Sequence, residues 1–107
     1  MKYRIVLVES AEWDIYDIHL YIEFNESPER ADTILDGLER SIAALADMPE
    51  RGHIPPELER IGIRDYREIH FKPYRIVYAI DGDCVIVHCV LDGRRDMQTL
   101  LQQRVLR

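Results

Sequence analysis

Two turn signals divide the stretch from Asp65 to Asp92 into three short segments with β-strand composition. Lys72-Pro73 separates the first segment from the second, and Asp81-Gly82-Asp83 separates the second from the third. The segments are rich in valine, isoleucine and tyrosine, which favour strands, and an Asp-Gly pair is a strong signal for a hairpin turn. This stretch therefore predicts a three-stranded antiparallel meander. The rest of the chain must supply what covers it.

The remaining segments predict one more strand and three helices. Residues 2–8 are β-rich, and apolar residues recur at helical spacing over residues 11–25 and 28–48. Ser27-Pro28 supplies an N-cap and a proline at the first position of the second helix, and Asp96 can cap a last short helix. The predicted fold is α+β, with one domain over residues 1–107. Its order is a strand, an antiparallel two-helix hairpin, the three-stranded antiparallel meander and a short C-terminal helix.

The turns also predict which side chains share a face of the meander. Pairing across the first turn puts His70 opposite Arg75, and a second turn of three residues puts Arg75 opposite Cys89. Opposed residues of an antiparallel ladder lie on the same face. One face mixes apolar and charged residues, so either the C-terminal helix or a partner chain should cover it. The other face is more apolar and should pack on the two helices. The first face carries Tyr66, Glu68, His70, Arg75, Val77, Ala79, Val85, Val87 and Cys89.

Basic side chains are predicted to gather at one end of the meander. His70, Arg75 and the Arg94-Arg95 pair should emerge near one another, beside the N-terminus of the last helix. Guanidinium groups and helix N-termini both bind anions, so this arrangement predicts an anion-binding corner. The alternative is that Arg75 pairs with Glu68 or Asp92, and that Arg94 and Arg95 are solvated.

No metal site or cofactor is expected from the spacing of the ligand-type residues. Cys84 and Cys89 lie five residues apart on one predicted strand. They should therefore be about 16 Å apart and point to opposite faces. No Cys-x-x-Cys is present, and no histidine spacing converges on a site.

Charge is divided unevenly along the chain. Residues 1–60 hold 6 Lys and Arg against 14 Asp and Glu, a net −8, whereas residues 61–107 hold 8 against 6, a net +2. Nucleic-acid binding usually draws on a concentrated basic footprint, which is thin here, so any anionic partner should dock on the sheet. No stretch approaches the roughly 20 apolar residues that span a bilayer. The first residues do not show a basic region followed by an apolar run and a cleavage site, so a signal peptide is not expected. A cytoplasmic location without membrane contact is expected.

Two motifs in the meander resemble a known family. Tyr74-Arg75-Ile76-Val77-Tyr78, followed by the Asp-Gly turn and by Val90-Leu91-Asp92-Gly93-Arg94-Arg95-Asp96, is similar to the signature of the RelE/ParE toxin superfamily. The order of strand, helices and meander across nearly all 107 residues is also similar to the fold of that superfamily. The resemblance implies a type II toxin-antitoxin toxin that causes growth arrest and is neutralised by a cognate antitoxin. Operator DNA would then be bound only indirectly, through the antitoxin.

Within the superfamily the chain looks more like ParE than RelE. The long helical hairpin, the Asp-Gly-Arg-Arg-Asp run and the helical tail imply inhibition of DNA gyrase and a role in plasmid stabilization. Arg75, Arg94 and Arg95 would bind the anion or target. The face that carries Glu68, His70 and Arg75 holds both apolar and charged residues and is called the mixed face below. The antitoxin is expected there, at Tyr66, Val77, Val85 and Val87.

The alternative implied by the resemblance is a RelE-like, ribosome-dependent mRNA endonuclease. Metal-free cleavage through the 2′-hydroxyl needs a base, an acid and cations for the developing phosphorane charge. Glu68 and His70 would act as base and acid, with Arg75 and Arg95 as the cations. RelE-like enzymes carry a tyrosine late in their C-terminal segment, and the matching position here is approximately that of Leu101. The missing tyrosine favours the ParE-like function. A third hypothesis is a degenerate toxin that only binds its antitoxin.

Overall fold

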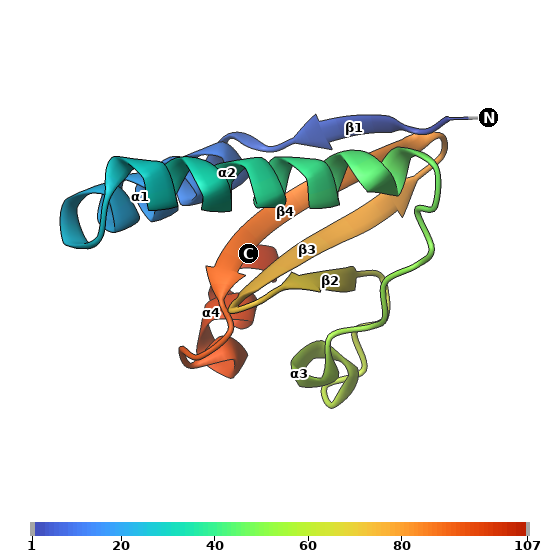
Figure 1. Cartoon of the computed structure of the whole chain (residues 1–107). Coiled ribbons are helices and arrows are strands. Elements are labelled where there is room, and N and C mark those ends of the chain that lie inside the picture. Colours follow the sequence, from blue (N-terminus) through green and yellow to red (C-terminus); the bar gives the residue numbers. More distant parts are fainter. Residues whose placement is uncertain (1, 107) are drawn as a thin grey trace.

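A four-stranded mixed sheet forms the centre of the molecule in a computed structural model, which describes residues 2–106 (Figure 1). The strand order is β1-β4-β3-β2. β2 (Arg67–Phe71), β3 (Tyr74–Asp81) and β4 (Cys84–Asp92) form the predicted antiparallel meander. β1 (Arg4–Leu7) adds to the outer edge of β4 in parallel. The α+β prediction is therefore confirmed, and the N-terminal strand completes the sheet.

A helical hairpin covers one face of the sheet. α1 (Glu9–Asn25) and α2 (Pro28–Ala43) are followed by a 3-10 turn at Ala44–Ala46. The predicted cap of α2 is confirmed, because the Arg30 backbone N–H donates to Ser27 Oγ at 3.0 Å. The apolar stripe of each helix packs on the sheet and buries the larger core. The helix residues of this core are Ala11, Ile15, Ile22, Ala31, Ile34, Leu38 and Ile42.

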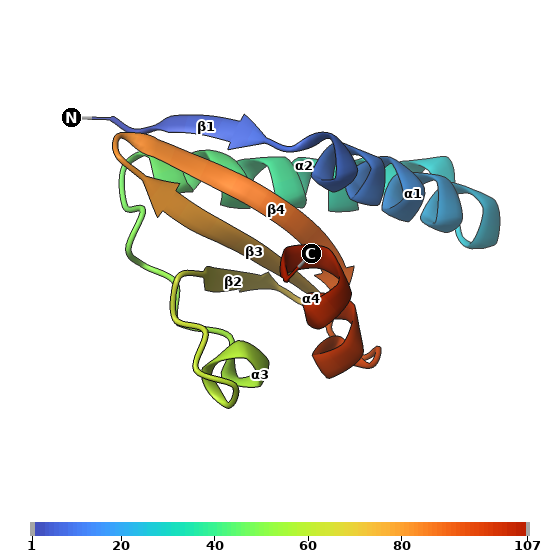
Figure 2. The same ribbon diagram turned by 180° about the vertical axis from the view of Figure 1, so that it is seen from behind.

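Two short helices cover the opposite face (Figure 2). α3 (Pro56–Glu59) and α4 (Met97–Val105) pack beside each other, and Asp96 caps α4 through the Thr99 backbone N–H and hydroxyl. The C-terminal helix is therefore the cover that the mixed face needed. This smaller core consists of Leu58, Val77, Cys89, Leu91, Met97 and Leu101. None of the helices among residues 2–106 is both long enough and apolar enough to cross a membrane.

The register of β3 and β4 differs from the prediction in two places. The turn between them has two residues, Gly82 and Asp83, rather than three, and Gly82 takes the positive φ of 61° that such turns favour. A register shift between Val77 and Tyr78 then moves the pairing by one more residue. The predicted pairing across the first turn, His70 with Arg75, is confirmed.

These shifts change which side chains share a face. Val85 pairs with Ile80, and Val87 pairs with Tyr78, so both valines lie in the core under α1 and α2. Beyond the register shift Val77 pairs with Cys89 on the other face, under α4. The prediction that Val85 and Val87 share the face of Glu68 is therefore wrong, whereas Val77 lies on that face as predicted. All three valines are fully buried, and the Tyr66 hydroxyl donates to the Val105 carbonyl oxygen of α4 at 3.4 Å.

The Tyr78 side chain fixes the loop that follows the 3-10 turn. Its buried hydroxyl donates to the Pro49 carbonyl oxygen at 2.7 Å and accepts from the Gly52 N–H at 3.1 Å. Tyr78→Phe is expected to lower the free energy of unfolding by about 1–3 kcal/mol, because it leaves buried backbone groups without a partner. Urea unfolding measures the change. Tyr16→Phe, at a side chain that is 54% exposed on α1, is the matched control and should change little. Equal effects of the two substitutions would contradict the prediction.

Candidate functional site

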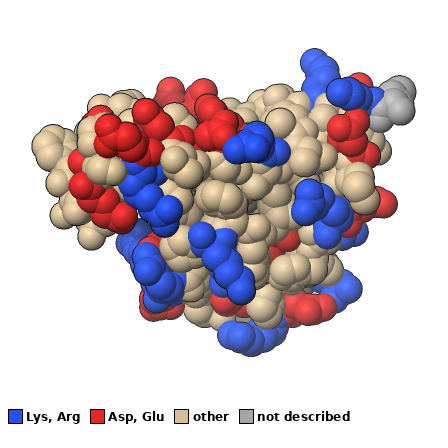
Figure 3. Space-filling view, viewed as in Figure 1, with Lys and Arg blue, Asp and Glu red and all other residues tan. Residues whose placement is uncertain are grey.

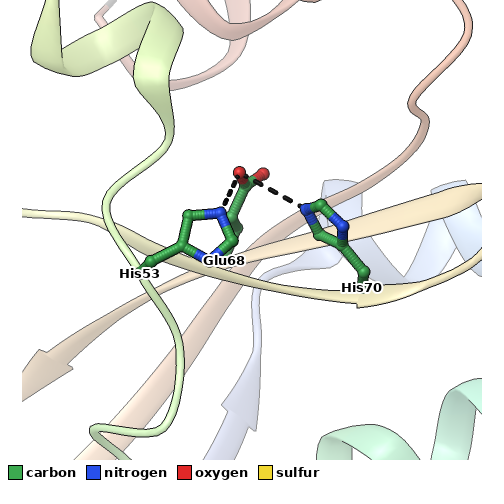
Figure 4. Close-up of side chains that lie close together, drawn as sticks. All are labelled: His53, Glu68 and His70. Atoms are coloured by element: carbon green, nitrogen blue, oxygen red, sulfur yellow. Dashed lines mark hydrogen bonds and ion pairs between the residues drawn. The ribbon is translucent and has the colours of Figure 1, made fainter.

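A buried carboxylate lies at the centre of the candidate site. Glu68 of β2 is 1% exposed, and both of its carboxylate oxygens have partners. Oε1 accepts from Arg75 Nε at 2.6 Å. Oε2 lies 2.9 Å from His53 Nε2 and 3.5 Å from His70 Nε2, and Figure 4 shows both imidazoles directed at this oxygen. The site therefore combines a carboxylate, a guanidinium and two imidazoles.

Arg75 of β3 is held between two carboxylates rather than facing solvent. Its Nη1 and Nη2 donate to the two carboxylate oxygens of Glu57 at 2.9 and 2.6 Å, while its Nε donates to Glu68. These hydrogen bonds, with Glu57 the stronger cause, raise the pKa of Arg75 further above its ordinary value. The guanidinium in turn lowers the pKa of Glu57. Every guanidinium nitrogen is thus engaged, and the side chain is only 12% exposed.

The loop before α3 brings His53 to Glu68. The two residues form an isolated antiparallel bridge, with the His53 N–H donating to the Glu68 carbonyl oxygen at 3.1 Å and the Glu68 N–H donating back at 2.7 Å. Arg67 Nη1 donates to the Gly52 carbonyl oxygen at 2.8 Å. A Cβ on Gly52 would lie 2.6 Å from the Glu68 carbonyl oxygen, so only glycine permits this close approach. The backbone therefore sets where the His53 imidazole lies.

An open cavity of about 230 Å³ borders the two imidazoles. It is lined by Ser41, Arg51, Gly52, His53, Glu68, Ile69 and His70. Two kinds of chemistry fit these groups. The histidines and the glutamate can exchange protons with a bound molecule, or the three can present ligand atoms to a metal ion, since these atoms lie within 4.8 Å of one another.

The structure brings Glu68, His70 and Arg75 together, but the Arg75 guanidinium is not free for the predicted anion corner. The Arg75 guanidinium is neutralised by carboxylates, which matches the alternative stated from the sequence. Arg94 is exposed and binds Asp92 of its own turn at 2.7 and 2.9 Å. Arg94 and the exposed Arg95 border a separate cavity of about 470 Å³ that Asp14, Asp17, Glu26 and Asp92 also line.

His53 is the site residue that the sequence prediction missed. The expectation that no histidine spacing converges is wrong, because His53 and His70 meet at one oxygen of Glu68. His53 lies in an irregular loop, 15 residues before Glu68, so neither helical nor strand periodicity relates the two. The only local signal is Gly52, whose close backbone approach is recognisable in the structure but not in the sequence.

The Glu57–Arg75 ion pair should make stability depend on pH. Because the pKa of Glu57 is lowered from the ordinary value of 4.5 in the folded protein, its contribution is fully present above that value and is lost as the pH falls through the folded pKa. We expect the unfolding free energy of the wild type to fall more steeply than that of Glu57→Gln between about pH 5 and pH 3. Urea unfolding across this range measures both slopes. Glu59→Gln removes one negative charge from the same helix as a control, and parallel curves for wild type and Glu57→Gln would refute the prediction.

Comparisons with known proteins agree with this architecture. The family model for the ParE toxin of the type II toxin-antitoxin system parDE matches residues 5–97 of the sequence. A search of curated proteins gives no significant match.

Three solved structures share the fold. The chromosomal ParDE toxin-antitoxin system from P. aeruginosa has a TM-score of 0.70 at 13% identity, over 83% of this chain and 94% of that one. The RelBE2 toxin-antitoxin complex from Mycobacterium tuberculosis has a TM-score of 0.62 at 20% identity, over 84% and 96%. A mutant of the E. coli toxin RelE in the free state has a TM-score of 0.67 at 18% identity, over 100% and 98%.

These structures show a shared fold, and the family model covers most of the sequence from β1 to the first residue of α4. The chain therefore belongs to the family of ParE toxins of type II toxin-antitoxin systems.

Proposed function

We propose that this toxin inhibits DNA gyrase and that a cognate antitoxin neutralises it. The observation that carries the proposal is the state of Arg75. In RNA cleavage its guanidinium would have to face the scissile phosphate, whereas here it donates to Glu57 and Glu68. The two carboxylates and one guanidinium have a net charge of −1, which opposes the approach of a phosphate. A protein target, rather than bound RNA, suits such a site better.

The surface charge also supports a protein target. On the face in Figure 3, acidic side chains gather over the end formed by the α1–α2 hairpin, while basic side chains are spread singly and interspersed with other residues. Phosphate binding in nucleic acids favours a concentrated basic surface. Arg94 and Arg95 are both exposed beside the start of α4, so we assign the gyrase contact to these two arginines and the helical tail.

A supercoiling assay with purified gyrase tests the proposal. The wild-type toxin should inhibit supercoiling of relaxed plasmid or trap cleaved DNA, and the double variant Arg94→Ala with Arg95→Ala should need at least about ten times more protein. Arg40→Ala is the matched control, because this exposed arginine lies on α2 and pairs with Asp36. No inhibition by the wild type at large excess would overturn the proposal.

The antitoxin needs an exposed surface, and the aromatic side chains of α1 supply one. Trp13 and Tyr16 are 58% and 54% exposed and meet edge to face with ring centroids 5.5 Å apart. Tyr21 and Phe24 are 67% and 80% exposed on the same helix. Exposed aromatic residues are enriched in protein interfaces, and the acidic residues of α1 suit a basic partner segment. We therefore assign the antitoxin contact to α1, in place of the buried valines.

Binding of the antitoxin to toxin variants tests this surface. Trp13→Ala should weaken binding at least about tenfold, since large aromatic side chains dominate interface energetics. Met48→Ala, at another apolar side chain that is 63% exposed, should not. Calorimetric titration with the protein encoded beside this gene measures both, and equal affinities for the two variants would exclude α1.

The second candidate function is ribosome-dependent mRNA cleavage, which the His53–Glu68–His70 arrangement favours. Glu68 would accept the proton of the 2′-hydroxyl, whose oxygen attacks the phosphorus. His70 would donate a proton to the leaving 5′-oxygen. Arg51 at the edge of the same cavity would then supply the cation that Arg75 does not.

Inducing the toxin in cells distinguishes the two functions. Trapped gyrase should raise an SOS reporter and leave transcripts intact, whereas RNA cleavage should produce cut transcripts without SOS induction. If transcripts are cut, His70→Ala should abolish the cuts, and normal cutting by that variant would exclude this mechanism. Growth of induced cells at the normal rate would favour a degenerate toxin.

A further inference from the structure

We propose that His53, Glu68 and His70 form a binding site for a divalent transition-metal ion, with Zn²⁺ as the best match. The three side chains come from the loop before α3 and from β2, and both imidazoles direct a ring nitrogen at one oxygen of Glu68 (Figure 4). The three donors are His53 Nε2, His70 Nε2 and Glu68 Oε2. Two imidazoles and a carboxylate are a known ligand set for zinc sites that keep an open position.

The distances between the donor atoms suit a small ion. Zn²⁺ binds nitrogen and oxygen ligands at about 2.0–2.2 Å, so two ligands of a tetrahedral site lie about 3.4 Å apart. The two imidazole nitrogens lie 2.9 and 3.5 Å from Glu68 Oε2, and no two of the three donors are more than 4.8 Å apart. Moving the two histidine side chains by less than about 1 Å gives tetrahedral separations. Both have room to move, because their side chains are 60% and 43% exposed.

The charges around Glu68 favour a cation at this point. Glu57 already neutralises the Arg75 guanidinium through two hydrogen bonds, so the charge of Glu68 is left for the ion. Arg75 also holds the other oxygen of Glu68, Oε1, at 2.6 Å. Such contacts to the outer atom of a ligand orient it and strengthen metal binding. The carboxylate is therefore fixed in place before an ion arrives.

The donor set also selects among metals. Ca²⁺ and Mg²⁺ prefer six or more oxygen ligands, whereas Zn²⁺, Co²⁺ and Ni²⁺ accept imidazole nitrogen. The cavity beside the imidazoles leaves space for a water molecule as the fourth ligand. A bound ion would join the His53 loop to β2, and it would withhold Glu68 and His70 from proton transfer.

Metal titration of the untagged, chelator-treated toxin tests the site. Calorimetry with ZnCl₂ should show one ion bound per chain, and Co²⁺ should give the visible absorption of a tetrahedral complex. His53→Ala and His70→Ala should each weaken binding at least about tenfold. MgCl₂ should show no binding at the same concentrations. Zinc should also raise the melting temperature of the wild type and not that of His53→Ala.

His19→Ala is the matched control. His19 Nε2 lies 2.9 Å from Asp32 Oδ1, so it forms a histidine–carboxylate pair on the helical side. Among residues 2–106, the only group of three or more ligand-type side chains close enough to share an ion is His53, Glu68 and His70. His19→Ala should bind zinc like the wild type. Wild-type protein without zinc affinity, His53→Ala and His70→Ala with full affinity, or a loss in His19→Ala would each overturn the proposal. Circular dichroism of the metal-free variants checks that they are folded.

Discussion

Replacing Arg75 with methionine is expected to lower the free energy of unfolding by about 3–5 kcal/mol, the largest effect of any substitution in the site. Arg75 is 12% exposed and donates to both Glu57 and the fully buried Glu68. Methionine fills a similar volume but removes the guanidinium that the two carboxylates share. A domain of this size has a total stability of about 5–15 kcal/mol, so a loss of this size removes much of it.

Urea unfolding of wild type and variants measures the loss. Arg75→Lys should lose less than Arg75→Met, because lysine keeps the charge but cannot donate to both carboxylates in the same geometry. The double variant Arg75→Met with Glu68→Gln should recover part of the stability, since the amide removes the unpaired buried charge. Arg94→Met, at a surface arginine, is the control that should unfold like the wild type. Equal stability of Arg75→Met and Arg94→Met would show that the buried ion pairs contribute nothing.

The elements of the fold were predictable because their signals are local. The N-cap at Ser27, the proline at the start of α2, the Asp96 cap and the turn after Phe71 each depend on a few neighbouring residues. The pairing of β1 with β4 joins residues about 80 positions apart, such as Arg4 with Cys84, and has no local signal. The strand was therefore predicted, whereas its parallel partner was not.

The register was less predictable because small local choices change whole faces. A slip of one residue sends every side chain of a strand to the opposite side of the sheet. The turn with Gly82 at its first central position causes one slip, which moves Val85 and Val87 to the helical core. The irregularity after Val77 causes a second slip, beyond which Val77 and Cys89 lie on the opposite face. Near the first turn, where no slip occurs, His70, Arg75 and Glu68 lie together as predicted. The limit of the sequence prediction was thus the pairing of β3 with β4.

The state of Arg75 could not be read from strand alternation alone. Alternation placed it on the face of Glu68, but its second partner, Glu57, comes from α3, after an irregular loop. An arginine that shares a face with a histidine can bind phosphate or can stabilise a buried acid. Only the position of α3 decides between them. This one contact changes a predicted anion site into a neutralised ion pair, and it leaves Glu68 for the two imidazoles.

Leu101→Ala is expected to lower the free energy of unfolding by about 2–5 kcal/mol and to release α4 from the sheet. Leu101 is fully buried among Leu58, Val77, Cys89 and Met97. α4 has nine residues, and isolated helices of that length are not stable in water, so its structure depends on this packing. Arg104 adds a bidentate ion pair to Asp14 of α1 at 2.9 Å, and Leu101→Ala alters neither of these two residues.

Urea unfolding measures the stability, and amide hydrogen exchange measures the release of the helix. The amides of α4 should exchange faster in Leu101→Ala than in the wild type, relative to those of α2. Leu106→Ala, at a side chain that is 41% exposed, is the matched control and should change neither quantity. If α4 contacts gyrase as proposed, Leu101→Ala should also inhibit supercoiling less while its affinity for an antitoxin on α1 is unchanged. Unaltered exchange in α4 would mean that the packing of Leu101 does not hold the helix on the sheet.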